Sequence, residues 1–175
     1  LRVYRVARFA ATLQFQVEEN TIKQMKKLKS ELATLPKERV FQEFKKALAS
    51  DKPSIFFDVL KKANVLDVYF KDIDNLIGKI QPAKYHPEGD SYCHTMLTLD
   101  SCAKLTKDLS IRFSCLVHDI GKGNSPEEIL PHHYGHEIRG EKIVENFGKI
   151  IGAPKKWIQC GKIASKEHLR GRKVQ

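Results

Sequence analysis

Apolar residues recur every three or four positions along most of this chain, which is the spacing of one buried face of an α-helix. Residues 1–15 follow this pattern, and residues 20–32 predict a second helix that Asn20 or Thr21 would cap. No segment alternates between apolar and polar residues for long enough to predict a strand. The pattern therefore predicts an all-α fold. The inward positions expected in the first helix are Val3, Val6, Ala7, Ala10 and Leu13.

A segment rich in glycine and proline divides the predicted helices into two groups. Pro36 and Pro53 each suit the first position of a helix in the first group. Residues 78–90 then break the helical pattern and form the best candidate for a boundary. We therefore expect a helical region over 1–84 and a second helical domain over 85–175.

The second group of helices carries clear end signals. Asp90 or Ser91 would cap a helix that reaches about Lys107, and Ser110 would cap the next. Gly121 would end that helix as the residue after its C-terminal cap. Two more helices would follow Gly135 and Pro154, with inward positions that include Ile138, Phe147, Trp157 and Ile163.

The charge of the chain favours an anionic partner without proving one. The net charge is +10, and residues 1–85 carry 17 Lys and Arg against 10 Asp and Glu. Such a bias can contact nucleic-acid phosphates, but it is also typical of a solvated lysine-rich surface. The absence of a long apolar run and of close cysteine pairs favours a cytoplasmic protein without a membrane span. The first residue is not Met, so we expect a fragment of a longer protein.

All seven histidines follow residue 85, and most lie at predicted helix ends. His94 falls in a first turn, and His118 with Asp119 ends the next helix. If these ends meet, their imidazoles and carboxylate can bind a divalent metal. Lys122 could then hold a phosphate as a point charge. A helix-terminal histidine can instead cap carbonyl groups, and we prefer that interpretation for His86 and His132. Further candidate ligands are His133, His136 and His168.

These motifs resemble the HD superfamily of metal-dependent phosphohydrolases. The segments that carry the likeness are Cys93-His94-Thr95-Met96-Leu97 and Leu116-Val117-His118-Asp119-Ile120-Gly121-Lys122-Gly123. With residues 81–90 and 131–137, the second half resembles the C-terminal half of bacterial multifunctional tRNA nucleotidyltransferases, the CCA-adding enzymes. Residues 1–11 and 37–44 resemble the neck helices of the same family.

The resemblance implies a function for several residues. Arg2 and Arg5 match arginines that contact the nucleotide substrates ATP and CTP, and the partner would be tRNA. His118, Asp119 and Lys122 would serve hydrolysis of a 2′,3′-cyclic phosphodiester, a 2′-nucleotide or a phosphomonoester, with His94 as a further metal ligand. The HD site would take Ni, Mn, Co or a similar ion, and Mg would serve the nucleotidyltransferase head.

Two departures from the family pattern leave alternatives open. The head domain has no match here, and neither does the further aspartate that usually completes an HD site. The chain could therefore be a non-catalytic tRNA-binding module with a degenerate HD domain. A stand-alone HD hydrolase with an unrelated helical extension is a third interpretation. The sequence does not indicate an oligomeric state.

Overall fold

The computed structural model describes residues 1–170, which contain α-helices and 3-10 helices but no strand. The predicted all-α class is confirmed. The helices of the first part are α1 (Arg2–Leu13), α2 (Glu19–Lys27), α3 (Lys29–Leu32), α4 (Lys37–Leu48), α5 (Ser54–Lys62) and α6 (Asp67–Asp74). The second part contains α7 (Ser91–Leu105), α8 (Leu109–Val117), η1 (Ile120–Asn124), η2 (Glu127–Ile129), α9 (His136–Ile151) and α10 (Lys155–Glu167).

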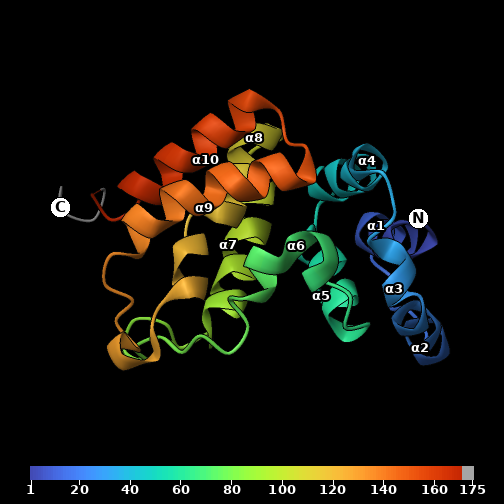
Figure 1. Cartoon of the computed structure of the whole chain (residues 1–175), viewed down its shortest axis with the longest axis horizontal. Helices are drawn as coiled ribbons and strands as arrows, with labels where there is room; N and C mark the ends of the chain where they lie inside the picture. The colour runs from blue at the N-terminus through green and yellow to red at the C-terminus, as the bar shows by residue number, and fades with distance from the viewer. Residues whose placement is uncertain (171–175) are drawn as a thin grey trace.

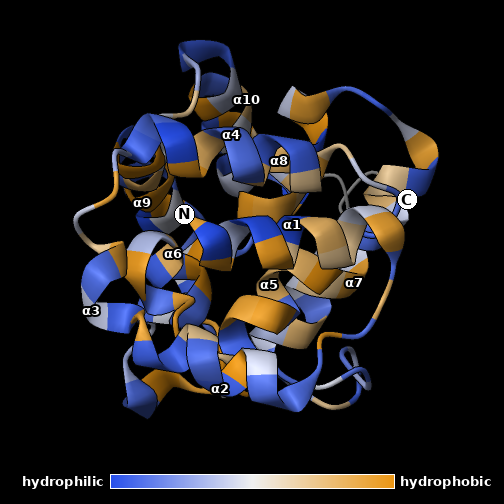
Figure 2. Ribbon diagram, turned by 90° about the vertical axis from the view of Figure 1, so that its right-hand side faces the viewer, coloured by the Kyte–Doolittle hydropathy of each residue, from blue (hydrophilic) through white to orange (hydrophobic). Residues whose placement is uncertain are grey.

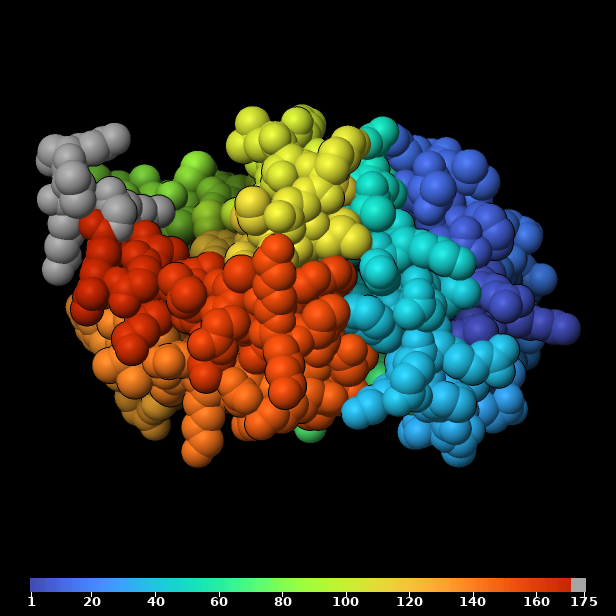
Figure 3. Space-filling model, turned by 90° about the horizontal axis from the view of Figure 1, so that it is seen from above, coloured from blue at the N-terminus to red at the C-terminus, as the bar shows by residue number. Residues whose placement is uncertain are grey.

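The two parts lie at opposite ends of an elongated molecule (Figures 1 and 3). In the first part, α1 packs on α4 and α5, while α10 packs on both α8 and α9 in the second. The buried apolar side chains of both parts nevertheless form one cluster. In this cluster Phe44 of α4 contacts Phe70 of α6, and Phe70 contacts Phe147 of α9. The outward side of α4 is largely hydrophilic (Figure 2). A shared core thus joins the segments on either side of residues 78–90.

Arg112 of α8 ties helices of both parts together. Its side chain is fully buried, and its guanidinium donates to the carbonyls of Leu48 and Ser50 at the end of α4. It also donates to the carbonyls of Ala103 and Thr106 at the end of α7. Carbonyls at helix ends lack partners within the helix. A positive charge also suits the C-terminal ends of two helix dipoles.

Several end signals have different roles from those predicted. The helix expected over residues 20–32 is broken at Leu28, with no proline or glycine to mark the break. Asp108, rather than Ser110, caps α8, because its carboxylate accepts the backbone N–H groups of Ser110 and Ile111. Gly121 does not end that helix, which stops at Val117. A side chain at Gly121 would meet the His136 carbonyl oxygen at 1.9 Å, so close packing of η1 on α9 requires glycine.

The predicted inward faces are correct in part. Ala7 and Ala10 are buried as expected, and Tyr4 joins them. Leu13, Ile138 and Ile163 were predicted to face inward, but each is more than half exposed. They lie on flanks of their helices that no other described element covers, a feature that helical spacing alone does not reveal.

Candidate metal centre

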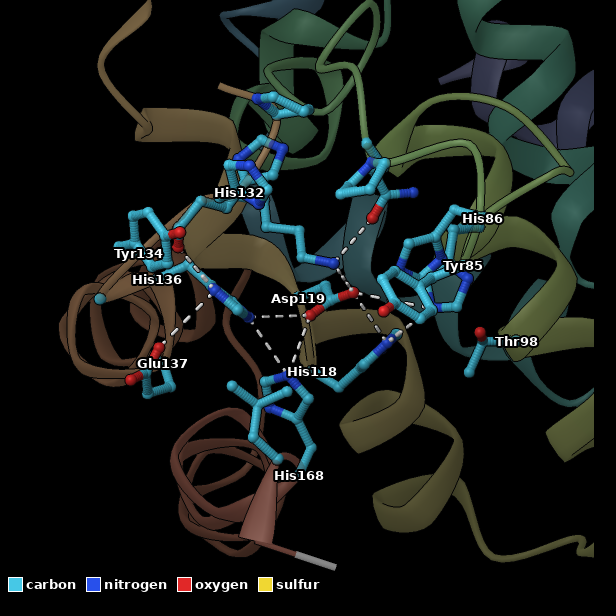
Figure 4. Close-up of a pocket in the computed structure, with 18 residues that line it drawn as sticks. Tyr85, His86, Thr98, His118, Asp119, His132, Tyr134, His136, Glu137 and His168 are labelled. Atoms are coloured by element: carbon cyan, nitrogen blue, oxygen red, sulfur yellow. Dashed lines mark hydrogen bonds and ion pairs between the residues drawn. The ribbon is translucent and has the colours of Figure 1, made fainter. Parts of the chain in front are cut away.

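Four helix ends meet around one buried carboxylate (Figure 4). Asp119 follows the last turn of α8, and its side chain is only 3% exposed. His94 comes from the first turn of α7, and His118 is the C-terminal cap of α8. His136 begins α9, and His168 is the C-terminal cap of α10. These residues line a cavity of about 560 Å³, which is within the usual range for a small-molecule site.

The imidazoles approach the carboxylate in two pairs, one at each oxygen. At Asp119 Oδ2, the Nε2 atoms of His118 and His94 lie at 3.3 and 3.6 Å. At Oδ1, the Nε2 atoms of His168 and His136 lie at 3.1 and 3.3 Å. The facing nitrogens are 3.3 Å apart in the first pair and 3.2 Å apart in the second. Asp119 therefore belongs to two groups of three potential metal ligands.

The backbone fixes which nitrogen faces the centre. Nδ1 of His118, of His136 and of His168 each lies within 2.9 Å of the carbonyl oxygen three residues earlier, at Cys115, His133 and Ser165. Each Nδ1 must donate a proton there, so a neutral ring turns the lone pair of Nε2 toward Asp119. Lone pairs that face each other at this distance require a proton or a cation between them. Imidazole nitrogen with carboxylate oxygen is a donor set for first-row divalent metals, so these residues fit such an ion.

The charges in the cluster are strongly coupled. Burial would raise the pKa of Asp119, but the charge of the neighbouring His118 and the close contacts of His118, His136 and His168 hold that pKa well below its usual value. Burial would lower the pKa of His118, but the Asp119 carboxylate raises it instead. The pKa of His94 is lowered, mainly by burial. The centre thus keeps a fixed negative charge among nitrogen ligands.

Lys122 adds a buried positive charge to the same cavity. Its ammonium lies 2.7 Å from Asp119 Oδ2 and 2.7 Å from Gln81 Oε1. The side chain is nearly buried, but it still lines the cavity. Lys122 therefore neutralises part of the Asp119 charge and leaves the site attractive to an anion that enters.

His133, a candidate ligand, is not part of this cluster. Its Nδ1 is 2.8 Å from Ser125 Oγ and its Nε2 is 2.7 Å from the Ile80 carbonyl oxygen. Both ring nitrogens are engaged, so this buried ring connects the loop before α9 to the Gly- and Pro-rich segment. The correction has a simple cause, since sequence spacing cannot show which way adjacent histidines point.

The sequence-based reasoning missed Glu88. Its carboxylate Oε1 lies 2.6 Å from His94 Nδ1 and 3.0 Å from His86 Nδ1. His86, interpreted above as a capping residue, instead lines the cavity beside His94. His132 also lines the cavity and stacks on Tyr134. An acidic residue shortly before a candidate ligand was the available signal for Glu88.

The arginines of α1 lie far along the chain from this centre. Arg2 and Arg5 are exposed, and Arg2 lines a surface pocket with residues of α3. Glu43 of α4 is buried, and its two oxygens lie 3.4 Å from Arg5 Nε and 2.8 Å from Arg8 Nε. Arg8 is thus tied to the protein more closely than Arg5, whose side chain remains 53% exposed.

Two known family models match separate segments of this chain. Residues 14–77 match a family model described as "Probable RNA and SrmB- binding site of polymerase A", and residues 91–173 match the HD domain. The chain is also 43% identical over 173 residues to the multifunctional CCA protein of Shewanella denitrificans, which covers 96% of this chain. The chain is therefore similar to the C-terminal part of that multifunctional CCA protein. It spans 42% of the length of that relative.

The residues of the histidine cluster lie within the HD match. His94, His118, Asp119, His136 and His168 all fall inside the matched residues 91–173. Glu88 and His86 precede that match, and Arg2 and Arg5 precede the RNA-binding match. Within residues 1–170, no helix combines the length and the apolar character that a membrane crossing needs.

Proposed function

We propose that this chain is the RNA-binding and HD portion of a tRNA nucleotidyltransferase, and that its HD domain hydrolyses phosphoesters with a divalent metal. The observation that carries the proposal is the convergence of four imidazoles on one buried carboxylate in an open cavity. Substrates would be 2′,3′-cyclic phosphodiesters, 2′-nucleotides or phosphomonoesters. The combination of imidazole nitrogen and carboxylate oxygen donors favours Ni, Mn, Co or a similar ion over a thiolate-bound structural zinc.

The residues of this chain have distinct roles in that reaction. His94, His118, Asp119, His136 and His168 would hold the metal, which supplies Lewis acidity to a phosphoryl oxygen and lowers the pKa of water. Lys122 keeps Asp119 in place through its 2.7 Å contact. Its charge also offsets the negative charge of a phosphate that enters the cavity. Because Asp119 belongs to two groups of three potential ligands, the cluster could hold either one ion or two.

The first part of the chain would serve tRNA. Residues 1–85 contain 17 Lys and Arg against 10 Asp and Glu, a bias that suits a phosphate backbone. In the full-length protein, Arg2 and Arg5 would contact ATP or CTP beside a nucleotidyltransferase head that uses Mg. Their exposure leaves both guanidinium groups accessible. Such a protein would work in the cytoplasm, where tRNA is processed.

Hydrolysis of a 2′,3′-cyclic nucleotide tests the proposal. The purified chain should release product when Ni²⁺, Mn²⁺ or Co²⁺ is added, and Asp119→Asn should abolish that release. Asp51→Asn is the matched control, because Asp51 is exposed and, among the described residues, pairs only with exposed Lys107. Equal rates in the Asp119→Asn variant and in the unmodified chain would refute the assignment of the centre.

A non-catalytic tRNA-binding module is the second candidate, favoured by the basic bias of residues 1–85. Such a module would bind tRNA with an affinity that falls steeply as salt rises, because phosphate contacts release counterions. It would bind no transition metal at the histidine cluster. Metal analysis of the purified chain beside a tRNA titration therefore separates the two functions.

A further inference from the structure

In three of the four ligand histidines, a backbone carbonyl accepts the Nδ1 proton. His118 and His168 cap the C-terminal ends of helices, where carbonyls lack partners within the helix and can accept from an imidazole. His136 begins α9 and uses the His133 carbonyl, which lies before the helix. In each of these three cases the backbone itself selects the nitrogen that faces Asp119.

His94 has no such carbonyl. It lies in the first turn of α7, where carbonyls point along the helix and accept N–H groups of the next turn. The Glu88 carboxylate occupies the corresponding position, with Oε1 2.6 Å from His94 Nδ1. An ionised carboxylate only accepts hydrogen bonds, so it requires the proton on Nδ1.

The structure around Glu88 holds this carboxylate in place. His86 Nδ1 lies 3.0 Å from the same oxygen, and the rings of His86 and His94 are 4.8 Å apart. Two residues after Glu88, the Asp90 carboxylate accepts the N–H groups of Cys93 and Gly78 at 2.8 and 2.6 Å. These contacts keep the Glu88 carboxylate directed at His94.

We propose that Glu88, steadied by His86, is a positioning residue that keeps the proton of His94 on Nδ1 and so presents Nε2 to the metal centre. The inference rests on the proposed function of that centre as a metal site. Partners of metal-binding histidines fix the tautomer and ring orientation, and their loss typically lowers metal affinity by about 10- to 100-fold. Within residues 1–170, Glu88 would be the one side-chain partner of this kind among the four ligand histidines.

Glu137 provides a matched control. Its carboxylate lies 3.6 Å from Nδ1 of the ligand His136, too far for a hydrogen bond. His136 Nδ1 instead meets the His133 carbonyl oxygen at 2.8 Å. Glu88→Ala and Glu137→Ala thus each remove a negative charge beside a ligand histidine. Only Glu88→Ala also removes the acceptor of that histidine's Nδ1 hydrogen bond.

Two measurements on the full chain test the proposal. Calorimetric titration with Ni²⁺ should show about 10- to 100-fold weaker binding in Glu88→Ala and less than a threefold change in Glu137→Ala. Glu88→Gln retains an uncharged acceptor and should fall between the unmodified chain and Glu88→Ala. In the metal-free chain, ¹⁵N NMR should show His94 protonated on Nδ1, and Glu88→Ala should move that proton to Nε2 or populate both tautomers.

The outcomes separate this inference from the proposed function. An unmodified chain that binds no Ni²⁺ contradicts the proposed metal site, and the His94 tautomer then still decides the role of Glu88. An unchanged tautomer in Glu88→Ala overturns the inference, even if Ni²⁺ binds tightly. Equal losses of affinity in Glu88→Ala and Glu137→Ala would also overturn it, because charge alone would then explain the effect.

Discussion

Replacing Arg112 with methionine should test whether the two parts of the chain fold as one unit. The guanidinium donates to four carbonyl oxygens at 2.7–2.8 Å, two at the end of α4 and two at the end of α7. Methionine fills similar space but donates nothing. The carbonyls of Leu48 and Ala103 lie in fully buried bonds, so both would lose their Arg112 partner away from water.

The expected loss follows from these two groups. A buried polar group left unsatisfied costs roughly 1–3 kcal/mol, which gives about 2–6 kcal/mol for two. Methionine carries no charge, so no unpaired charge adds to this cost. We therefore expect the free energy of unfolding to fall by about 4 kcal/mol, the middle of this range. For a chain of this length the Tm should fall by about 8–16 °C, because each kcal/mol shifts Tm by roughly 2–4 °C.

Calorimetry or circular dichroism during heating would measure this change. Arg112→Lys should lose less, because an ammonium retains the charge and some of the bonds but not the planar fork. A single cooperative transition is expected in both variants, since one core joins the parts. A loss below about 1 kcal/mol for Arg112→Met would refute the reasoning, because the two carbonyls would then find other partners.

Further substitutions test individual contacts of the fold. Gly121→Ala should destabilise the chain by roughly 3 kcal/mol in urea, because the added carbon meets backbone of α9 at 1.9 Å. A Cβ at Gly161 would meet only side-chain atoms, of Val117 at 2.9 Å and of Phe113 and Val144 at 3.1 Å. Gly161→Ala should therefore cost less, about 1 kcal/mol, and an equal loss would contradict the argument. Asp90→Ala should cost about 1 kcal/mol through loss of the α7 cap, whereas Asp90→Asn should retain most of that stability; no difference between them would argue against capping.

Helical spacing and end signals predicted most of the fold. Asp90 caps α7 as expected, and Pro36 and Pro53 directly precede α4 and α5. The break at Leu28 carries no local signal, so periodicity joined two helices into one. The role of Gly121 depends on α9, which lies later in the chain, and no local pattern could show that contact.

The histidine cluster was predictable only as a set of candidates. His94, His118 and Asp119 shared a recognisable spacing, but the meeting of four helix ends depends on long-range packing. Adjacent His132 and His133 have different partners, since His132 stacks on Tyr134 whereas Ser125 and the Ile80 carbonyl engage both ring nitrogens of His133. Glu88 lies in a loop, where its contact with His94 depends on the path of the backbone rather than on a repeating pattern.

An anomalous diffraction experiment tests the central claim most directly. Crystals of the chain grown with Ni²⁺ or Co²⁺ should give an anomalous peak within bonding distance of the Asp119 carboxylate and at least two of the four Nε2 atoms. The same crystals of Asp119→Asn should lose that peak. No peak at the cluster, or peaks only at surface histidines such as His132, would contradict the assignment of a metal centre.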